Sequence, residues 1–266
     1  AAVEMGITKI RLTGGEPLVR RGVADFIREL KQINGLEDLS MTTNGFFLSE
    51  MAQFLKDAGL DRVNVSLDSL DRGKFKDITG FDSLARVLKG IDTALKLGLT
   101  PVKINVVLLN GINDDEVEDF IKLTINKPLS VRFIELMPTN HELKGTDEGH
   151  FISAQKIKEK IQKKFPEMKT ASVENGCGPA SYYQLKGAQG TFGFITAVSQ
   201  HFCARCNRIR LTAEGNLRPC LFSSKELELK KELRKMSINE HNLRKRLIKG
   251  FLKEAVKAKP LRHGLA

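Results

Sequence analysis

Apolar positions along the first part of the chain alternate between two spacings. Short runs rich in β-branched and other apolar residues recur, and each is followed by a stretch with apolar residues at helical spacing. The pattern predicts strands at residues 7–13, 39–43, 62–68, 101–109 and 130–137, with Ser49 beginning the helix after the second strand and Gly59 ending it. Repeated strand–helix units are typical of a parallel sheet, so we predict an α/β fold.

The pattern changes after Met137, where a second domain is expected to begin. Strand-like segments at 181–185 and 191–198 lie among glycines and aromatic residues and predict a β-hairpin. From Ser223 onward, apolar residues at helical spacing among many Lys and Arg predict a pair of helices with solvated basic faces.

Several predicted strands carry polar side chains on one face. Asn64, Ser66 and Asp68 alternate with apolar residues in the third strand, and Arg11 and Lys103 occupy similar positions in the first and fourth. Strands covered by helices are normally apolar on both faces, and the carboxyl ends of barrel strands are where active sites assemble. The row therefore predicts a cavity or ligand site, although single members also suit turns or caps.

Composition narrows the function classes. A net charge of +11 attracts a nucleotide, a nucleic acid or an acidic membrane surface. With 2 Tyr and no Trp, the chain lacks the aromatic and basic stripe of a single-strand nucleic-acid binder, and no apolar run is long enough to span a membrane. Four Cys in a chain of 266 residues, three of them clustered, fit a reducing compartment, so a cytoplasmic location is expected.

Cys203, Cys206 and Cys220 form a candidate metal site. Thiolates at such spacing favour zinc or an iron–sulfur cluster. Zinc requires a fourth ligand, which His201 or Cys177 supplies, whereas three cysteines alone suit a four-iron cluster with one iron open to substrate. Spacing by itself leaves both metals open, and a redox-active CxxC is a third interpretation.

Three arginines adjoin these thiolates and favour an iron–sulfur cluster over zinc. Arg205, Arg208 and Arg210 place positive charge where an anionic cluster and an anionic substrate would meet. The alternative is an exposed strand with solvated arginines.

The motifs of the chain resemble those of the GTP 3',8-cyclase family, and they cover nearly its whole length. The resemblance is carried by the runs Arg11 to Leu18, Thr42 to Gly45, Asn64 to Asp68, Arg132 to Met137, Phe192 to Gln200, Phe202–Cys203, Cys206 to Arg208, Arg210 to Thr212, Gly215 and Cys220 to Phe222. It implies a radical S-adenosylmethionine (SAM) enzyme that converts GTP to (8S)-3',8-cyclo-7,8-dihydroguanosine 5'-triphosphate, an early step of molybdopterin biosynthesis.

The resemblance also implies a fold and a set of site residues. Residues 1–138 are expected to form an incomplete, TIM-like (β/α) radical SAM barrel, and residues 139–266 a smaller α+β domain with an auxiliary cluster and a basic helical tail. The implied GTP contacts are Arg11, Thr42, Lys103, Arg208 and Arg210; the SAM contacts are Gly15, Ser66 and Met137; and the ligands of the auxiliary [4Fe-4S] cluster are Cys203, Cys206 and Cys220.

One family motif is absent from this sequence. No CxxxCxxC occurs, so a second [4Fe-4S] cluster is expected on a missing N-terminal segment, and the chain as given is expected to lack turnover. The ending Gly264-Leu265-Ala266 also differs from the family's terminal pair of glycines.

The expected partners are GTP and an electron donor. Binding to a membrane or to a nucleic acid is not expected, and the question of a homodimer is left open. Two alternative functions stay open as well: a zinc-bearing RNA-binding or regulatory module, and another radical SAM enzyme with an auxiliary cluster, such as a peptide maturase.

Overall fold

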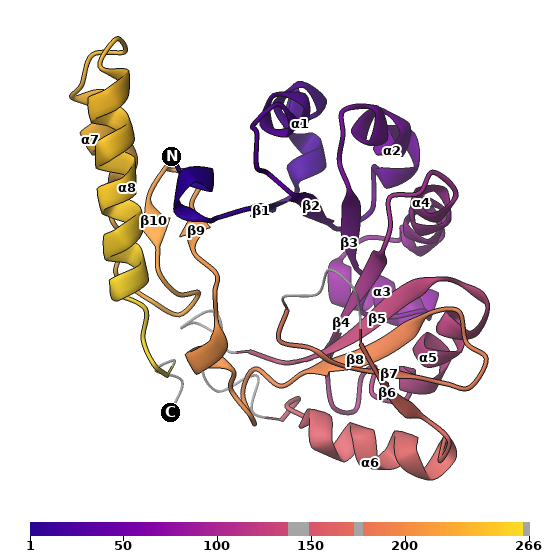
Figure 1. Ribbon diagram of the computed structural model, residues 1–266. Coiled ribbons are helices and arrows are strands. Elements are labelled where there is room, and N and C mark those ends of the chain that lie inside the picture. The colour runs from indigo at the N-terminus through magenta and orange to yellow at the C-terminus, as the bar shows by residue number, and fades with distance from the viewer. Residues whose placement is uncertain (138–148, 173–177, 263–266) are drawn as a thin grey trace.

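The computed structural model describes residues 1–137, 149–172 and 178–262. Its main feature is a curved sheet of eight strands in the order β1-β2-β3-β4-β5-β8-β7-β6 (Figure 1). The strands are β1 (Lys9–Leu12), β2 (Asp38–Thr43), β3 (Arg62–Ser66), β4 (Val102–Leu108), β5 (Leu129–Glu135), β6 (Lys169–Ala171), β7 (Ser181–Gln184) and β8 (Thr191–Ile195).

The five predicted strands correspond to β1 through β5, with ends that differ by at most two residues. Neighbouring members of this set pair in parallel, which confirms the α/β prediction. The predicted hairpin is also confirmed, because β7 and β8 pair antiparallel. Since β8 pairs in parallel with β5 as well, the hairpin extends the barrel sheet into the part of the chain after residue 138.

Helices follow the first five strands and cover the outer side of the sheet (Figure 1). They are α1 (Val23–Lys31), α2 (Leu48–Asp57), α3 (Arg72–Thr79), α4 (Leu84–Lys96), α5 (Val117–Asn126) and α6 (Ala154–Lys164). Gly59 follows the end of α2 with a φ of +97°, as predicted. The predicted start at Ser49 is wrong: the chain turns at Gly45, whose carbonyl accepts from the Leu48 amide, so the helix begins one residue earlier.

The main core lies between the sheet and these helices. Phe133 on β5 is fully buried and meets Phe120 on α5 edge-on, with ring centroids 6.3 Å apart. Phe133 also packs against Phe194 of β8, with ring centroids 5.6 Å apart. This packing fixes β8 beside β5 and leaves the polar alternate positions on the concave face.

A second, smaller body lies opposite the helical layer (Figure 1). It contains the short hairpin of β9 (Arg210–Leu211) and β10 (Leu217–Arg218) and the predicted basic helices, α7 (Leu229–Arg234) and α8 (His241–Lys257). Its apolar cluster is centred on Leu217, Leu229, Leu252 and Ala255, and Ala2, Met5 and Ile7 near the N-terminus pack against it.

Within the described ranges, no helix combines the length and the apolarity that crossing a bilayer requires.

Candidate active site

The concave face of the sheet is lined with polar side chains. Directly paired residues project to the same side of a sheet, so the register identifies which side chains share this face. Three cross-strand rows result, namely Arg11, Ser40 and Arg62; Thr42, Asn64 and Lys103; and Ser66, Asn105 and Arg132. The predicted polar row is therefore real, and it extends over five strands.

Positive charge is concentrated and buried in these rows. Lys103, Arg62 and Arg132 are only 3%, 5% and 6% exposed. Asp38 accepts two hydrogen bonds from Arg62, at 2.9 and 2.6 Å, and the Asn64 carbonyl oxygen accepts one from Arg132 at 2.9 Å. Burying several cations together is costly unless an anion joins them, so this face is suited to an anionic ligand.

The pKa of Lys103 reflects this crowding. Burial, followed by the charges of Arg132, Arg62 and Arg11, lowers the pKa of Lys103 to about 7. Desolvation by the surrounding strands, followed by Arg132, likewise lowers the pKa of Arg11 to about 10, although the Arg11 side chain is open to solvent on the concave side. A bound anion would reverse the effect on Lys103 and favour its charged form.

Three buried polar atoms on this face have no hydrogen-bond partner among the described residues. They are Arg62 Nη1, Arg132 Nε and Asn105 Oδ1. Native proteins rarely leave such groups unpaired in their interiors. Two donors and one acceptor on one face of the sheet therefore lack the hydrogen bonds that a polar ligand or ordered water supplies.

The three clustered cysteines lie in the smaller body. Cys203 begins a short 3-10 turn, Cys203–Arg205, and its carbonyl accepts from the Cys206 amide at 3.1 Å. The chain then runs through β9 and returns in β10, where Arg218 pairs with Arg210. Lys259 donates to the carbonyls of both Arg208 and Pro219, so the limb that leads to Cys220 lies beside the limb that follows Cys206.

Arg208 and Arg210 connect these thiols to the concave face. The Arg208 guanidinium lies over the Phe202 ring, 5.1 Å from its centroid, and its charge acts on both Arg11 and Arg132. Arg210 is within electrostatic reach of Arg208, Cys206 and Cys220. Arg208 is therefore close enough to act electrostatically on the Cys206 thiol and on the arginines of the cationic strands.

The Cys206 thiol has a shifted pKa. Burial alone would raise it, but hydrogen bonds to Arg208 and the charges of Arg208 and Lys259 together lower the pKa below its ordinary value. A thiol that ionises readily suits a metal ligand, because thiolates are the ligating form.

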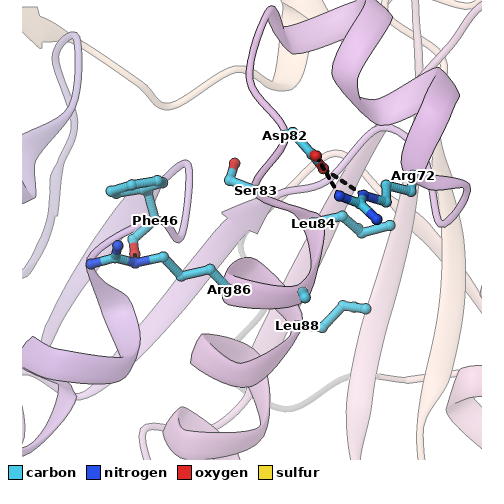
Figure 2. A pocket seen from close by; sticks show the side chains of 8 residues that line it. Phe46, Arg72, Asp82, Ser83, Leu84, Arg86 and Leu88 are labelled. Carbon is cyan, nitrogen blue, oxygen red and sulfur yellow. Dashed lines mark hydrogen bonds and ion pairs between the residues drawn. The ribbon is translucent and has the colours of Figure 1, made fainter.

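A pocket of about 660 Å³ lies elsewhere, between the turn after β2 and the start of α4 (Figure 2). Arg72 and Asp82 form a two-bond ion pair beside it, and the Arg86 guanidinium stacks on the Phe46 ring at 4.0 Å. None of its lining residues belongs to the cationic rows or to the cysteine hairpin. We therefore place the candidate site on the concave face, which carries the unpaired polar atoms and the buried cations.

Two protein-family models together match most of the chain. The Radical SAM superfamily model matches residues 1–124, and the Molybdenum Cofactor Synthesis C model matches residues 129–265. The GTP 3',8-cyclase of Pelotomaculum thermopropionicum is 47% identical over 263 residues, covering 99% of this chain and 79% of the relative. That of Thermodesulfovibrio yellowstonii is 49% identical over 247 residues, covering 93% of this chain and 76% of the relative.

The chain belongs to the GTP 3',8-cyclase family. This is a family of radical SAM enzymes in molybdenum cofactor biosynthesis, and the two alternative functions considered from the sequence are set aside. Among solved structures, Streptococcus suis SuiB bound to S-adenosylmethionine has a TM-score of 0.58 and 13% identity, covering 91% of this chain and 58% of that one. At that identity the likeness concerns the fold alone, and it agrees with a partial TIM-like barrel.

The residues implied as GTP contacts of a GTP 3',8-cyclase lie near one another. Arg11, Lys103 and Arg208 belong to one electrostatically coupled group, and Thr42 receives a hydrogen bond from Asn64 at 3.3 Å within the same rows. Arg210 lies on the side of the group nearest the cysteines.

The implied SAM contacts are distributed along one edge of the sheet. Gly15, Ser66 and Met137 lie at the carboxyl ends of β1, β3 and β5, which run parallel and therefore end on the same side. A Cβ added at Gly15 would meet nothing within 4 Å, so the turn offers open space beside the backbone. Asp68, expected in the polar row, instead accepts from the Val107 amide at 2.7 Å and fastens β3 to β4.

The three cysteines do not form a single-ion site. Across the parts of the chain that the structure describes, no group of three His, Cys, Asp or Glu is arranged to hold one metal ion. Cys177, considered as a fourth zinc ligand, lies outside those parts.

Two members of the site were missed in the sequence. Arg62 and Arg132 line the concave face together with Asn64 and Lys103. The alternation in the sequence does place Arg62 on this face, because Arg62 precedes Asn64 by two residues and shares its side of the strand. Arg62 was nevertheless not predicted as a site residue, because a charged residue at the start of a strand is ordinarily exposed.

Proposed function

We propose that the concave face binds GTP through Arg11, Thr42, Lys103, Arg208 and Arg210. The observation that supports this most strongly is the concentration of buried cations next to donors that lack partners. A triphosphate supplies several negative charges and many acceptor oxygens, which such a face requires. Lys103 in particular would become charged on binding, because an anion offsets the neighbouring arginines.

Cys203, Cys206 and Cys220 are proposed to hold an auxiliary [4Fe-4S] cluster. Three observations fit this group: the hairpin returns Cys220 toward Cys206, all three thiols are partly accessible, and Arg210 lies near two of them. Three protein ligands leave one iron of a four-iron cluster open. Because Arg208 reaches both the thiols and the cationic strands, that open position would face the proposed nucleotide site.

Gly15, Ser66 and Met137 are proposed to contact SAM along the carboxyl edge of the sheet. SAM bound to a reduced [4Fe-4S] cluster supplies the radical that initiates the reaction on GTP. The residues of this chain orient GTP and limit its contact with water. The four cysteines of the sequence contain no CxxxCxxC, so we assign no residue here to the cluster that activates SAM.

We also propose the division of the chain into a partial barrel, residues 1–138, and a C-terminal domain, residues 139–266. In this division the C-terminal part supplies β6, β7 and β8 to the barrel sheet. A cytoplasmic location, an electron donor and a homodimer stay predictions.

Calorimetric titration with GTP tests the nucleotide site. Arg208→Ala and Lys103→Met should each weaken GTP binding at least tenfold, because each removes a charged contact in a desolvated site. Arg72→Ala, which alters the pocket of Figure 2, is the matched control and should leave the affinity unchanged. Loss of affinity in the Arg72 variant alone would place the nucleotide in that pocket instead.

Anaerobic reconstitution with iron and sulfide tests the cluster. The chain should acquire about four irons and a brown absorbance, and Cys203→Ser, Cys206→Ser and Cys220→Ser should each lose most of both. Zinc without iron–sulfur absorbance would contradict the assignment.

A further inference from the structure

Lys259 connects α8 to the cysteine hairpin. Its ammonium group donates to the Arg208 carbonyl at 2.7 Å and to the Pro219 carbonyl at 3.3 Å. It also lies 3.6 Å from the Cys206 sulfur, within hydrogen-bond range for a sulfur acceptor. The three N–H donors of one lysine thus have three acceptors on two separate limbs of the hairpin.

The two limbs are those that carry the cysteines. Arg208 follows Cys206 by two residues, and Pro219 directly precedes Cys220. A single cation bonded to both limbs therefore fixes the separation between the second and third thiols. The contact with the Cys206 sulfur places the same charge against a metal ligand.

A packed helix holds Lys259 in place. The residue lies just beyond α8, and its amide donates to the Val256 carbonyl at 3.2 Å. Leu252 and Ala255 of α8 are buried against Leu217 of β10. The lysine is therefore fixed relative to the hairpin by apolar contacts that do not depend on a bound metal.

We propose that Lys259 is a positioning residue that spaces the thiols of Cys206 and Cys220 and tunes the cluster they hold. Hydrogen bonds and positive charge at a cluster sulfur stabilise the more negative, reduced state and raise the reduction potential. This inference rests on the proposed assignment of the three cysteines to an iron–sulfur cluster. It adds a residue from the C-terminal end of the fold to those that control that cluster.

The test uses the full chain, anaerobically reconstituted, with Lys259→Met compared to Lys257→Met. Lys257 ends α8 and is exposed, so it controls for loss of charge in the same region. In a redox titration followed by electron paramagnetic resonance, Lys259→Met should make one-electron reduction roughly tenfold less favourable, a shift of about 59 mV to lower potential. Lys259→Arg, which keeps the charge, should recover part of that shift.

Hydrogen exchange of the chain before reconstitution provides a second readout. Amides of residues 206–220 should exchange faster in Lys259→Met than in Lys257→Met, because one limb is no longer tied to the other. Should the methionine variant unfold, Lys259→Gln, which keeps an N–H donor but loses the charge, is measured in the same way.

The outcomes separate the two proposals. Equal potentials and equal exchange in the Lys259 and Lys257 variants would overturn the role of Lys259 while leaving the cluster in place. If Cys206→Ser retains all the iron of the parent chain, the cluster assignment itself fails, and the redox part of the inference fails with it.

Discussion

Lys103 shows how a single residue on the concave face acquires unusual chemistry. It is almost completely buried, and three arginines contribute to the lowering of its pKa to about 7. Near neutral pH the side chain is thus close to its midpoint of ionisation. Small changes in the charge around it should change its protonation.

Binding of GTP should therefore take up protons. At pH 8, between the lowered pKa of Lys103 and its ordinary value of 10.5, an anion that charges Lys103 should bring in close to one proton (about 1 per site). Calorimetry in buffers of different ionisation enthalpy measures this number. Lys103→Met should abolish the uptake, whereas Lys96→Met, at an exposed position of α4, should preserve it.

The same residue predicts how stability without ligand depends on pH. Between pH 7 and 10.5 the unfolded lysine holds a proton that the folded one has released, so unfolding takes up protons and stability rises with pH. The slope due to Lys103 should approach ~1.4 kcal/mol per pH unit in mid-window. Urea unfolding at several pH values should show a flatter profile for Lys103→Met; an unchanged profile would contradict the lowered pKa.

Glu135, the last residue of β5, has a structural role at the carboxyl end of that strand. Fully buried, it accepts hydrogen bonds from the amides of Ala154, Val198 and Ser199 at 2.8–2.9 Å. These bonds join the end of β5 to the start of α6 and to the loop that leads to Cys203. Met137 lies two residues further on, so Glu135 fixes the strand end that carries a proposed SAM contact.

Glu135→Ala should lower the free energy of unfolding by about 3 kcal/mol, because several buried amides lose their acceptor. Glu135→Gln should cost less, since a carbonyl oxygen still accepts. Asp119→Ala, which removes an exposed ion pair with Lys122, should change stability by less than about 0.5 kcal/mol. A similar small effect for Glu135→Ala in urea unfolding would show that the amides find other partners.

At the scale of elements, the pairing of β7 and β8 depends on the close approach of the β7 backbone to Gly193 of β8. A Cβ at Gly193 would lie 2.6 Å from the Ser181 carbonyl oxygen, and 3.0 Å from the Tyr182 ring. Tyr182 is opposite Gly193 in the register. Burial lowers the pKa of Arg132, and the neighbouring Tyr182 offsets part of that lowering. The missing side chain thus lets the hairpin contact the cationic rows.

Gly193→Ala should destabilise the protein by ~1–3 kcal/mol, because the obstacle is backbone that cannot move away cheaply. Gly250→Ala provides the opposite case: it lies inside α8 with nothing within 4 Å of the added methyl and should stabilise by up to ~1 kcal/mol. Thermal unfolding of both variants measures the contrast. Equal effects would mean that the hairpin relaxes around the added carbon.

At the scale of the whole molecule, the N-terminal segment packs against helix α8 near the other end of the sequence. Glu4 pairs with both Lys245 and Lys249 of α8, and Met5 and Ile7 join the apolar cluster beneath that helix. Hydrogen bonds from the two lysines lower the pKa of Glu4 to about 2. The N-terminal segment thereby helps hold the body that carries the cysteines.

Since this carboxylate is exposed, its contribution should be small and sensitive to salt. A carboxylate whose pKa is lower in the folded state stabilises the fold at pH values above its unfolded pKa of 4.5. This stabilisation is lost as the pH falls toward 2. Glu4→Gln should accordingly speed hydrogen exchange in α8 at neutral pH and low salt. The difference should vanish at high salt or near pH 2; persistence under both conditions would mean that packing, not charge, is altered.

The sequence alone determined the parallel strands, the hairpin, the basic helices and the family, because hydrophobic spacing and motifs are local properties of the chain. It also identified the polar face, since period-two alternation reports which residues share a side. Tertiary structure decided what that face contains: Arg62 and Arg132 join it through cross-strand register, and burial, together with arginines on other strands, lowers the pKa of Lys103. It also decided the place of Lys259, which packing of α8 brings to Cys206 from 53 residues away along the chain. Contacts of that sequence separation arise from packing, and no local pattern encodes them.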